Sequence, residues 1–446
     1  MYVDFLLERF NEERDSDALI WRDQTISYGW IVDTFNRLNE DFDTHGIEEG
    51  SVISLESDFS PLSVAMLLVL MNRGCIIVPL TDSVESKKPE FRDIAEIETT
   101  VRIDSIDEMN VRHTGHSPGN EFLVKLKERG HPGLVLFSSG STGKSKAALH
   151  DFVPMLRKFE QERHTLRTIT FLLFDHIGGI NTLLYNLSNT GCVVTVSDRH
   201  PAAICKAIEK YRVQLLPTSP TFLNLLLVSR AYENHDLSSL ELVTYGTEVM
   251  PEKTLERFHK EFPDVRLLQT YGLSEVGILR SKSRSSDSLW VKVGGEGFET
   301  RVVDGLLEIK AESSMLGYLN APDPFTDDGW FRTGDAVEVD GEYIKILGRR
   351  SEIINVGGEK VYPAEIEGIL QTMDDVEDAA VTGESNAITG QAVVARVKLL
   401  TDETLPSFRK RMREHFKDLP RFKMPQKVIL AGDSLHGTRF KKMRNE

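Results

Sequence analysis

The amino-acid sequence predicts an α/β protein with a large N-terminal α/β body, a β-rich subdomain in that body, and a small mobile C-terminal α+β lid. The chain has 446 residues, which is too long for one ordinary domain. Short apolar strand candidates alternate with helical stretches through most of the chain, as in parallel sheets covered by helices. After about residue 289, short strands and turns replace that alternation. We expect a body at 1–347 with the subdomain at about 289–347, a lid at 348–446, and a hinge near 349–352.

The body begins with a βαβ pattern. The runs SVISLE at 51–56 and CIIVPL at 75–80 are apolar and bounded by Gly and Pro, which favours strands buried on both faces. The segment between them predicts a helix. Similar strand candidates recur at 164–174, 192–197, 213–219 and 240–246, beside helical stretches at 201–212 and 251–262.

The last third of the chain predicts hairpins followed by a separate small domain. Asp304-Gly305 and Asp340-Gly341 are hairpin-type dipeptides between apolar strand candidates. The polar run at 280–288 is interpreted as a solvated loop. Past residue 348, a helix, a strand and a second helix are expected at 361–373, 391–400 and 404–419, about the size of a compact α+β domain.

The composition excludes several classes of protein. A formal net charge of −16 with 27% charged and 40% hydrophobic residues predicts an acidic globular protein without general affinity for nucleic acid or anionic membranes. The longest apolar run, at 63–71, is much shorter than the roughly 20 residues of a membrane span. The N-terminus lacks a signal-peptide pattern, and three widely spaced cysteines indicate neither a disulfide framework nor a metal cluster. We expect a cytoplasmic location.

The stretch LFSSGSTGKSKAALH at 136–150 is the first candidate for ligand binding. It lies between a strand-like run and what the sequence predicts as the start of an apolar helix. Gly-rich loops with a lysine bind phosphate through their backbone amides. A P-loop requires four residues between its first Gly and its Gly-Lys pair, whereas Gly140 and Gly143 are separated by two. The stretch is therefore not a P-loop, and a flexible Ser/Gly turn is the alternative.

Residues 137–147, FSSGSTGKSKA, resemble the phosphate loop of the acyl-adenylate-forming superfamily. This superfamily includes acyl-CoA synthetases, adenylation domains of nonribosomal peptide synthetases, and luciferases. Ser145 and Ala147 replace the usual Pro and Gly, and Lys146, not Lys144, matches the family's lysine. The resemblance implies that phosphate is held by Ser138, Ser139, Gly140, Ser141, Thr142, Gly143 and Lys146.

The stretch TYGLSEVG at 270–277 resembles a second family motif. The resemblance implies that the Tyr271 ring stacks on adenine, that Gly272 belongs to the nucleotide site, that the Ser274 hydroxyl meets phosphate, and that Glu275 holds Mg²⁺. A hard cation that bridges phosphate oxygens prefers carboxylate and water ligands, which agrees with this role. A strand end followed by a helix cap is the alternative interpretation of the motif taken alone.

Three further stretches resemble the family's nucleotide and thiol sites. YGTEVMP at 245–251 is similar to the adenine-facing loop, and GWFRTGD at 329–335 to the segment whose Asp accepts both ribose hydroxyls. GRRSEIINVGGEKVYPAEIE at 348–367 is similar to the hinge segment, with Ser351 at the hinge position. The implied residues are Gly246, Thr247 and Glu248 for adenine, Asp335 and Arg349 for ribose, and Gly358 for the pantetheine path.

The stretch LLFDHIGGINTLL at 172–184 resembles the pocket segment in which a His or aromatic residue gates the acyl site. His176 takes that place, with a purely structural histidine as the alternative. The neighbouring Asp175 is interpreted as a polar residue that lines the pocket, rather than as the counter-charge of a substrate ammonium group.

The family ends on a lysine that inserts between the carboxylate and the α-phosphate. The spacing from Thr438 and the apolar Met443 favour Lys442 for this role, whereas Arg444 three places on favours Lys441. The Gly that usually precedes the lysine is absent, and a solvated basic C-terminus is the alternative interpretation.

The resemblance implies an acid–thiol ligase. Such an enzyme uses ATP and Mg²⁺ to convert a carboxylic acid into an acyl-AMP with release of pyrophosphate, and then transfers the acyl group to a thiol, here expected to be CoA. The alternative acceptor is the phosphopantetheine of an acyl or peptidyl carrier protein, for which the basic residues at 409–416 offer a patch, unless they are only a solvated helix face. A non-catalytic nucleotide-binding protein is disfavoured by Glu275, Asp335 and the two tail lysines. The acid and the oligomeric state are not predicted.

Overall fold

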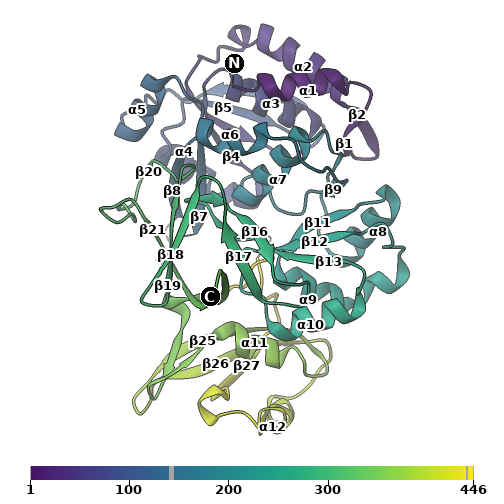
Figure 1. The fold of residues 1–446 in the computed structure, drawn as a ribbon, viewed down its shortest axis with the longest axis vertical. Coiled ribbons are helices and arrows are strands. Elements are labelled where there is room, and N and C mark those ends of the chain that lie inside the picture. Colours follow the sequence, from purple (N-terminus) through teal and green to yellow (C-terminus); the bar gives the residue numbers. More distant parts are fainter. Residues whose placement is uncertain (1, 140–144, 438–439, 445–446) are drawn as a thin grey trace.

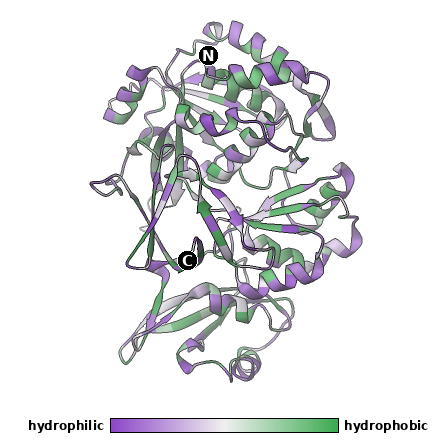
Figure 2. Cartoon of the chain, in the orientation of Figure 1, coloured by the Kyte–Doolittle hydropathy of each residue, from purple (hydrophilic) through white to green (hydrophobic). Residues whose placement is uncertain are grey.

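The computed structural model describes residues 2–139, 145–437 and 440–444. These residues form two seven-stranded sheets with helices, a six-stranded antiparallel sheet, and a small C-terminal domain, which is yellow-green at the bottom of Figure 1. Hydrophobic residues concentrate in α3 and in the strands of the sheets, whereas hydrophilic residues run along outer helices such as α10 (Figure 2). The α/β class and the small C-terminal domain expected from the sequence are therefore present.

The first seven-stranded sheet has the order β20-β8-β7-β4-β3-β5-β6. Its centre is the predicted βαβ unit, because β3 and β4 pair in parallel and α3 connects them. Helix α3 is buried almost throughout and begins with a capping box between Ser60 and Ser63. The bounds are β3 Val52–Glu56, α3 Pro61–Asn72, β4 Ile76–Leu80, α4 Lys88–Ile94, β5 Thr99–Ile103, β6 Met109–His113, α5 Glu121–Arg129, β7 Gly133–Ser139, β8 Ser145–Asp151, α6 Phe152–Glu160 and β20 Gly317–Tyr318.

The helix predicted directly after the phosphate loop is wrong. Residues 145–151 form β8, which pairs with β7 in an antiparallel hairpin. Ala147 and Leu149 pack in one core cluster and Ala148 in another, so these apolar residues face opposite sides, as in a strand. The helix begins only at Phe152, where the Asp151 side chain accepts a hydrogen bond from the Val153 amide at 3.0 Å.

The second seven-stranded sheet has the order β13-β12-β11-β9-β10-β1-β2 and is parallel except for β2. Helices α8, α9 and α10 pack on it through one core cluster, whereas α7 belongs to the core of the first sheet. The bounds are α1 Asp4–Glu12, β1 Asp17–Trp21, β2 Gln24–Ser27, α2 Tyr28–Glu40, β9 Thr168–Ile169, α7 Ile177–Ser188, β10 Val193–Val194, α8 Pro201–Tyr211, β11 Leu215–Thr218, α9 Pro220–Ser229, β12 Leu242–Tyr245, α10 Glu252–Glu261 and β13 Arg266–Gln269. The strands expected at 164–174 and 192–197 shorten to two residues each.

The β-rich region is an antiparallel sheet of order β16-β17-β22-β21-β19-β18. The turn at Asp304-Gly305 joins β18 and β19 as predicted, with both residues at positive φ. The bounds are β14 Gly272–Leu273, β15 Gly277–Ile278, β16 Arg280–Ser283, β17 Trp290–Gly294, β18 Phe298–Val303, β19 Leu306–Ala311, β21 Phe331–Asp340 and β22 Tyr343–Arg349.

The loop predicted at 280–288 is partly wrong, because it begins with strand β16. Its serines lie along the edge of β13 and accept backbone hydrogen bonds there. The amides of Leu267 and Gln269 donate to the hydroxyls of Ser286 and Ser283 at 3.2 and 2.9 Å. These hydroxyls replace the carbonyls that a further strand would supply, so a polar composition here is compatible with sheet structure.

The C-terminal domain has its own apolar core. Strand β26 lies between β25 and both β23 and β27, and α11 and α12 cover the sheet. A short 3₁₀ turn, Arg350–Glu352, connects it to β22. The bounds are β23 Ile354–Val356, β24 Glu359–Val361, α11 Pro363–Leu370, β25 Val376–Asn386, β26 Gly390–Leu399, α12 Leu405–His415 and β27 Lys427–Leu430. Among the described residues, no helix combines the length and apolar character that a bilayer crossing demands.

Candidate active site

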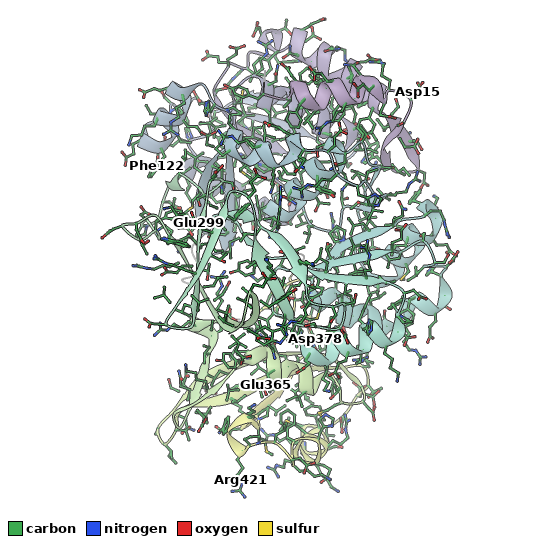
Figure 3. The ribbon with its side chains drawn as sticks, viewed as in Figure 1. Asp15, Phe122, Glu299, Glu365, Asp378 and Arg421 are labelled. Atoms are coloured by element: carbon green, nitrogen blue, oxygen red, sulfur yellow. The ribbon has the colours of Figure 1, made fainter. Side chains whose placement is uncertain are left out.

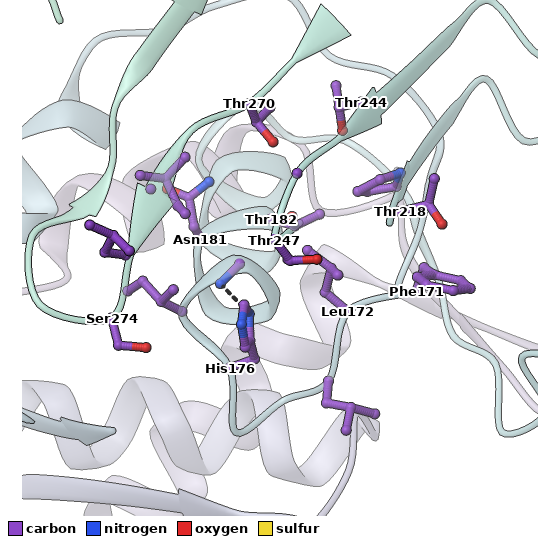
Figure 4. A pocket seen from close by; sticks show the side chains of 18 of the residues that line it. Phe171, Leu172, His176, Asn181, Thr182, Thr218, Thr244, Thr247, Thr270 and Ser274 are labelled. Atoms are coloured by element: carbon purple, nitrogen blue, oxygen red, sulfur yellow. Dashed lines mark hydrogen bonds between the residues drawn. The ribbon is translucent and has the colours of Figure 1, made fainter. Parts of the chain in front are cut away.

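A cavity of about 640 Å³ lies between α7, the ends of β11 to β13, the β-rich sheet and the C-terminal tail. Figure 4 shows part of it, with His176 and Ser274 near one end and Thr182, Thr218 and Thr244 toward the other. Segments that are far apart in the sequence meet here. The predicted residues that line the cavity are Ser138, Lys146, His176, Gly246, Thr247, Gly272, Ser274, Glu275, Arg349 and Lys441.

Glu275 is held in place by the elements around it. The Tyr318 hydroxyl donates to its Oε1 at 2.7 Å, and the Met315 amide donates to its backbone carbonyl at 2.7 Å. Burial, with the negative charge of Glu275, raises the pKa of Tyr318 well above its usual range, so this hydroxyl stays a donor. Within the described ranges no three His, Cys, Asp or Glu side chains gather as a metal site. A single carboxylate fits a cation such as Mg²⁺, whose remaining ligands are phosphate and water.

His150 is a buried residue of this site that the sequence did not single out. Its Nε2 lies 2.5 Å from the carbonyl of Ser274, and its Nδ1 lies 3.2 Å from the carbonyl of Ser313. Burial lowers the pKa of His150, so the neutral ring has one N–H to donate, and the shorter contact indicates Nε2. The ring thereby fixes the backbone next to Glu275.

Two positive side chains reach the cavity near Glu275. The Lys146 ammonium lies over the Tyr318 ring, 5.1 Å from its centroid. Arg349 donates through Nε to Asp335 Oδ1 at 2.8 Å, while the Tyr271 hydroxyl donates to Asp335 Oδ2 at 2.5 Å. Burial and the charge of Asp335 raise the pKa of Tyr271, so its hydroxyl remains protonated. Asp335 thus fixes the guanidinium that lines the cavity.

His176 lies directly before α7 and is its N-cap. Its Nδ1 accepts a hydrogen bond from the Gly178 amide at 3.0 Å, drawn as the dashed line in Figure 4, which leaves the ring proton on Nε2. A Cβ at Gly179 would lie 1.9 Å from the Leu173 carbonyl oxygen, so the first turn of α7 packs closely on the loop before it only with glycine there. The Gly-Gly pair places His176 at the cavity wall.

Two models of known protein families match this chain. The family model described as AMP-binding enzyme matches residues 81–304, and the model described as AMP-binding enzyme C-terminal domain matches residues 365–442. The chain belongs to the AMP-binding enzyme family. Its predicted family and α/β fold are therefore confirmed.

The curated relatives of this AMP-binding enzyme include acid–CoA ligases. An indoleacetate–CoA ligase of Aromatoleum aromaticum is 27% identical over 97% of this chain and 94% of its own length. A 2-succinylbenzoate–CoA ligase of Enterococcus faecalis is 25% identical over 67% of this chain and 65% of its own length. These relatives agree with the predicted class of enzyme, an AMP-forming acid–thiol ligase.

Solved structures of low sequence identity share the fold. An anthranilate CoA ligase in complex with anthranoyl-AMP has a TM-score of 0.79 at 18% identity and covers 99% of this chain and 95% of its own. An O-succinylbenzoate coenzyme A synthetase from Bacillus subtilis, in complex with ATP and magnesium ion, has a TM-score of 0.72 at 19% identity and covers 99% and 98%. Both align over the body and the C-terminal domain of this AMP-binding enzyme.

Some predicted residues do not line the cavity in the described part of the enzyme. Tyr271 and Asp335 lie behind Arg349, and Glu248 contacts the C-terminal tail. Gly358 is in the turn between β23 and β24, where a Cβ would meet no atom within 4 Å. Ser139 ends β7. Gly140, Ser141, Thr142 and Gly143 lie outside the described residues.

The interpretation of Asp175 as a cavity-lining residue is wrong. Asp175 is buried in the loop before α7 and accepts a hydrogen bond from the Thr81 hydroxyl at 3.0 Å. Thr81 directly follows β4 of the first sheet, and Asp175 is not among the residues that line the cavity. It therefore supports the fold at this position.

The structure separates the two tail lysines. Lys441 lines the cavity, whereas the Lys442 ammonium is buried against Asp378 and donates to the Ala379 carbonyl at 2.6 Å. Although burial opposes its charged form, Asp378 raises the pKa of Lys442. Asp378 lies where the C-terminal domain meets the body (Figure 3). The sequence could not show this pairing, because Asp378 is 64 residues away.

The rest of the tail has contacts to both domains. Arg444 forms a bidentate pair with Glu367 of α11, with both N–O distances 2.8 Å. Glu248 of the body accepts a hydrogen bond from the Lys442 amide at 2.5 Å. Phe440 packs in the core of the body, and its carbonyl accepts a hydrogen bond from Ser219 at 2.7 Å. These contacts fix Lys441 between the two domains.

Proposed function

We propose that this enzyme activates a carboxylic acid with ATP to give an acyl-AMP and pyrophosphate, and then transfers the acyl group to the thiol of CoA. The observation that supports it is that Lys146, Ser274, Glu275, Arg349 and Lys441 meet in one cavity whose other end is formed by α7 and three strands. We further infer that it acts in the cytoplasm, where ATP and CoA are available together.

The first step joins two anions. A carboxylate oxygen attacks the α-phosphorus, the new C–O–P linkage forms, and the bond to the pyrophosphate oxygen breaks. Mg²⁺ bound with ATP would neutralise phosphate charge, and Glu275 is the carboxylate that would hold it. In a chain of net charge −16, the attraction for these anions is supplied locally by Lys146, Arg349 and Lys441. We assign Lys441, rather than Lys442, to the place between carboxylate and α-phosphate.

The other contacts that we propose for the nucleotide are made by further residues at this cavity. Gly246 and Thr247 lie at the cavity wall after β12, where glycine allows close approach of adenine. The Gly246 position cannot carry a Cβ without meeting the Thr270 hydroxyl at 2.6 Å. Arg349, which Asp335 orients, would bind ribose. His176 lines the cavity on the side of Ser274, where it would separate the reacting carboxylate from solvent.

The second step requires Lys441 to leave. We infer that the C-terminal domain turns about the 3₁₀ turn Arg350–Glu352, which contains Ser351. The ion pairs of Lys442 and Arg444 with Asp378 and Glu367 would carry the tail along with that domain. The turn at Gly358 would then approach the cavity and admit the thiol.

The acid is expected to be bulky. The relatives named above act on indoleacetate and 2-succinylbenzoate, and we infer an acid of comparable size for this enzyme. A carrier protein remains the alternative acceptor, since Arg409, Lys410 and Arg413 of α12 make no ion pair among the described residues. Their neighbours Phe408 and Met412 are buried, so this basic face is the solvent face of α12.

The test is ATP–pyrophosphate exchange over a panel of aryl, fatty, hydroxy and amino acids, followed by thioester formation with CoA and, separately, with a phosphopantetheinylated carrier. Exchange with transfer to CoA is expected. Transfer to the carrier alone would replace the proposed acceptor. Exchange with none of the acids would contradict the proposed function.

A further inference from the structure

Resting on the proposed function, we propose that the acyl group of the substrate carries an oxygen atom that accepts a hydrogen bond from the side-chain amide of Asn181, and that Lys158 is the residue that positions this amide. The proposal concerns the acyl end of the cavity, and Asn181 lies in the stretch 172–184, for which the family resemblance gave a role to His176 and none to Asn181. It names the class of acid: one with a keto, hydroxyl or second carboxylate oxygen along its chain.

The acyl end is a slot between one helix face and one sheet face. Helix α7 presents Gly178, Asn181, Thr182 and Tyr185, whose spacing of three and four residues places them on one side of the helix. Strands β11, β12 and β13 face this helix with two rows of side chains, each row made of residues that are paired across the three strands. Figure 4 shows Thr244 and Thr218 on these strands and Asn181 and Thr182 on the helix. The rows are Leu215, Leu242 and Arg266, and Pro217, Thr244 and Leu268.

Lys158 lies behind Asn181 on α6. Its ammonium is 2.6 Å from Asn181 Oδ1 and 3.5 Å from the carbonyl of Ile278. An ammonium group only donates, so the amide atom that faces it is the oxygen. The Asn181 Nδ2 group is left to face the cavity, and it makes no hydrogen bond within the residues that the structure covers. The donor direction is thus set by Lys158.

The positive charge of Lys158 has no carboxylate beside it among the described residues. Arg163, whose charge also lowers the pKa of Lys158, is itself positive. Burial lowers the pKa of Lys158 to about 8, so it is still largely protonated at neutral pH. A positive charge behind an amide donor strengthens binding of an oxygen acceptor and disfavours a substrate ammonium.

The hydroxyl groups in the slot agree with a polar substrate. The Thr218 hydroxyl is buried without a hydrogen-bond partner in the described chain. Thr182 and Thr244 have no side-chain hydrogen bond within the same residues. A plain aliphatic chain would leave these groups unpaired, which costs about 1–3 kcal/mol for each buried group. An oxygenated acyl group would satisfy them.

The test uses pairs of acids of equal chain length, one plain and one with a single keto or hydroxyl oxygen, with that oxygen moved stepwise along the chain. We expect the unmodified enzyme to prefer the oxygenated acid by about tenfold in kcat/KM at one position of the oxygen, the effect of one hydrogen bond to a polarised donor. The preference should reside in KM for the acid, while KM for ATP is the same for both.

Four variants test whether the preference depends on the pair of Asn181 and Lys158. Asn181→Asp keeps the size and the oxygen that Lys158 contacts but removes the donor, so it should abolish the preference without loss of thermal stability. Asn181→Leu, which removes the donor without adding a charge, should also abolish the preference. Lys158→Met should reduce the preference, and Lys158→Arg, which restores a donor to Oδ1, should recover part of it.

The outcomes distinguish this proposal from the proposed function. Exchange with plain acids and no preference for any oxygenated partner would overturn the role of Asn181 and leave the ligase function standing. An unchanged preference in Asn181→Asp would also overturn it. Exchange with none of the acids would overturn both proposals.

Discussion

The two ends of the cavity are lined by different kinds of side chain. Lys146, Glu275, Arg349 and Lys441 lie at the nucleotide end, whereas α7 and strands β11 to β13 line the acyl end mainly with leucine, threonine and asparagine. Most residues of the nucleotide end belong to short contiguous sequence motifs. The residues of the acyl end are far apart in the sequence, and strand register and helix periodicity bring them together. The reaction is therefore encoded locally in the sequence, while the choice of acid is encoded in the packing.

The largest expected effect is at the nucleotide end. Lys441→Ala should lower pyrophosphate exchange by about 10²–10³-fold with every acid, because it removes a positive charge from the place where the anions meet. Thermal stability should be unchanged. Lys442→Met is the matched control, since breaking a buried ion pair costs about 3–5 kcal/mol and should lower Tm. A loss of exchange in Lys442→Met at unchanged Tm, with Lys441→Ala active, would reverse the assignment of the two lysines.

A smaller effect is expected from the tail residue that joins the two domains. Phe440→Ala should lower adenylation about tenfold or more, since loss of a buried aromatic side chain costs a few kcal/mol and the tail would leave the body more often. Thioester formation from added acyl-AMP should not fall. Phe440→Leu, which keeps an apolar anchor, is the control. Equal losses in both half-reactions would indicate that Phe440 only stabilises the fold.

At the acyl end, Thr218→Val should change selectivity and not the chemistry. The buried hydroxyl has no partner among the described residues, so its replacement by a methyl group of similar size should leave stability equal or raise it by about 1 kcal/mol. Rates with plain acids should be equal or higher. A loss of exchange with all acids would show that the acyl and nucleotide ends are not separable at this position.

The last prediction concerns the dependence of stability on pH. The pKa of Lys158 is about 8 in the folded protein, against an ordinary lysine value of 10.5. Between these values the unfolded chain binds more protons, so the free energy of unfolding should rise with pH from about 8 to about 10. Below pH 8 the cost of the buried charge is constant. Urea unfolding of Lys158→Met should lack this rise, and parallel curves for both proteins would contradict the shift.

Sequence patterns were sufficient for the α/β class, for the βαβ unit and for the presence of a small C-terminal domain. At the nucleotide end, Ser274 and Glu275 of one predicted motif line the cavity, whereas Tyr271 of the same motif does not. The strand after the phosphate loop was missed because Ala147, Ala148 and Leu149 form a short apolar run without polar alternation. Strand β16 was missed because its serines bond the edge of β13, a contact that composition does not reveal.

Other features could not be predicted because they depend on distant contacts. Lys441 and Lys442 are adjacent in sequence, and only the structure shows that Lys442 pairs with Asp378 while Lys441 lines the cavity. The rows of the acyl slot join residues about 25 positions apart in successive strands. Asn181 in isolation is a polar residue on a helix. Its orientation becomes meaningful only when Lys158, on another helix, is seen to contact its oxygen.

The tail also bears on how the two half-reactions are balanced. Phe440 belongs to the core of the body, and Lys442, two residues later, belongs to the C-terminal domain. Under the proposed two-step function, the preference for the adenylating arrangement would depend on these few tail side chains outside the cavity. Substitution of one aromatic residue there could shift the time the enzyme spends in each half-reaction while every group that touches the substrates stays the same. Evolution could thus adjust turnover at these side chains independently of what the enzyme binds.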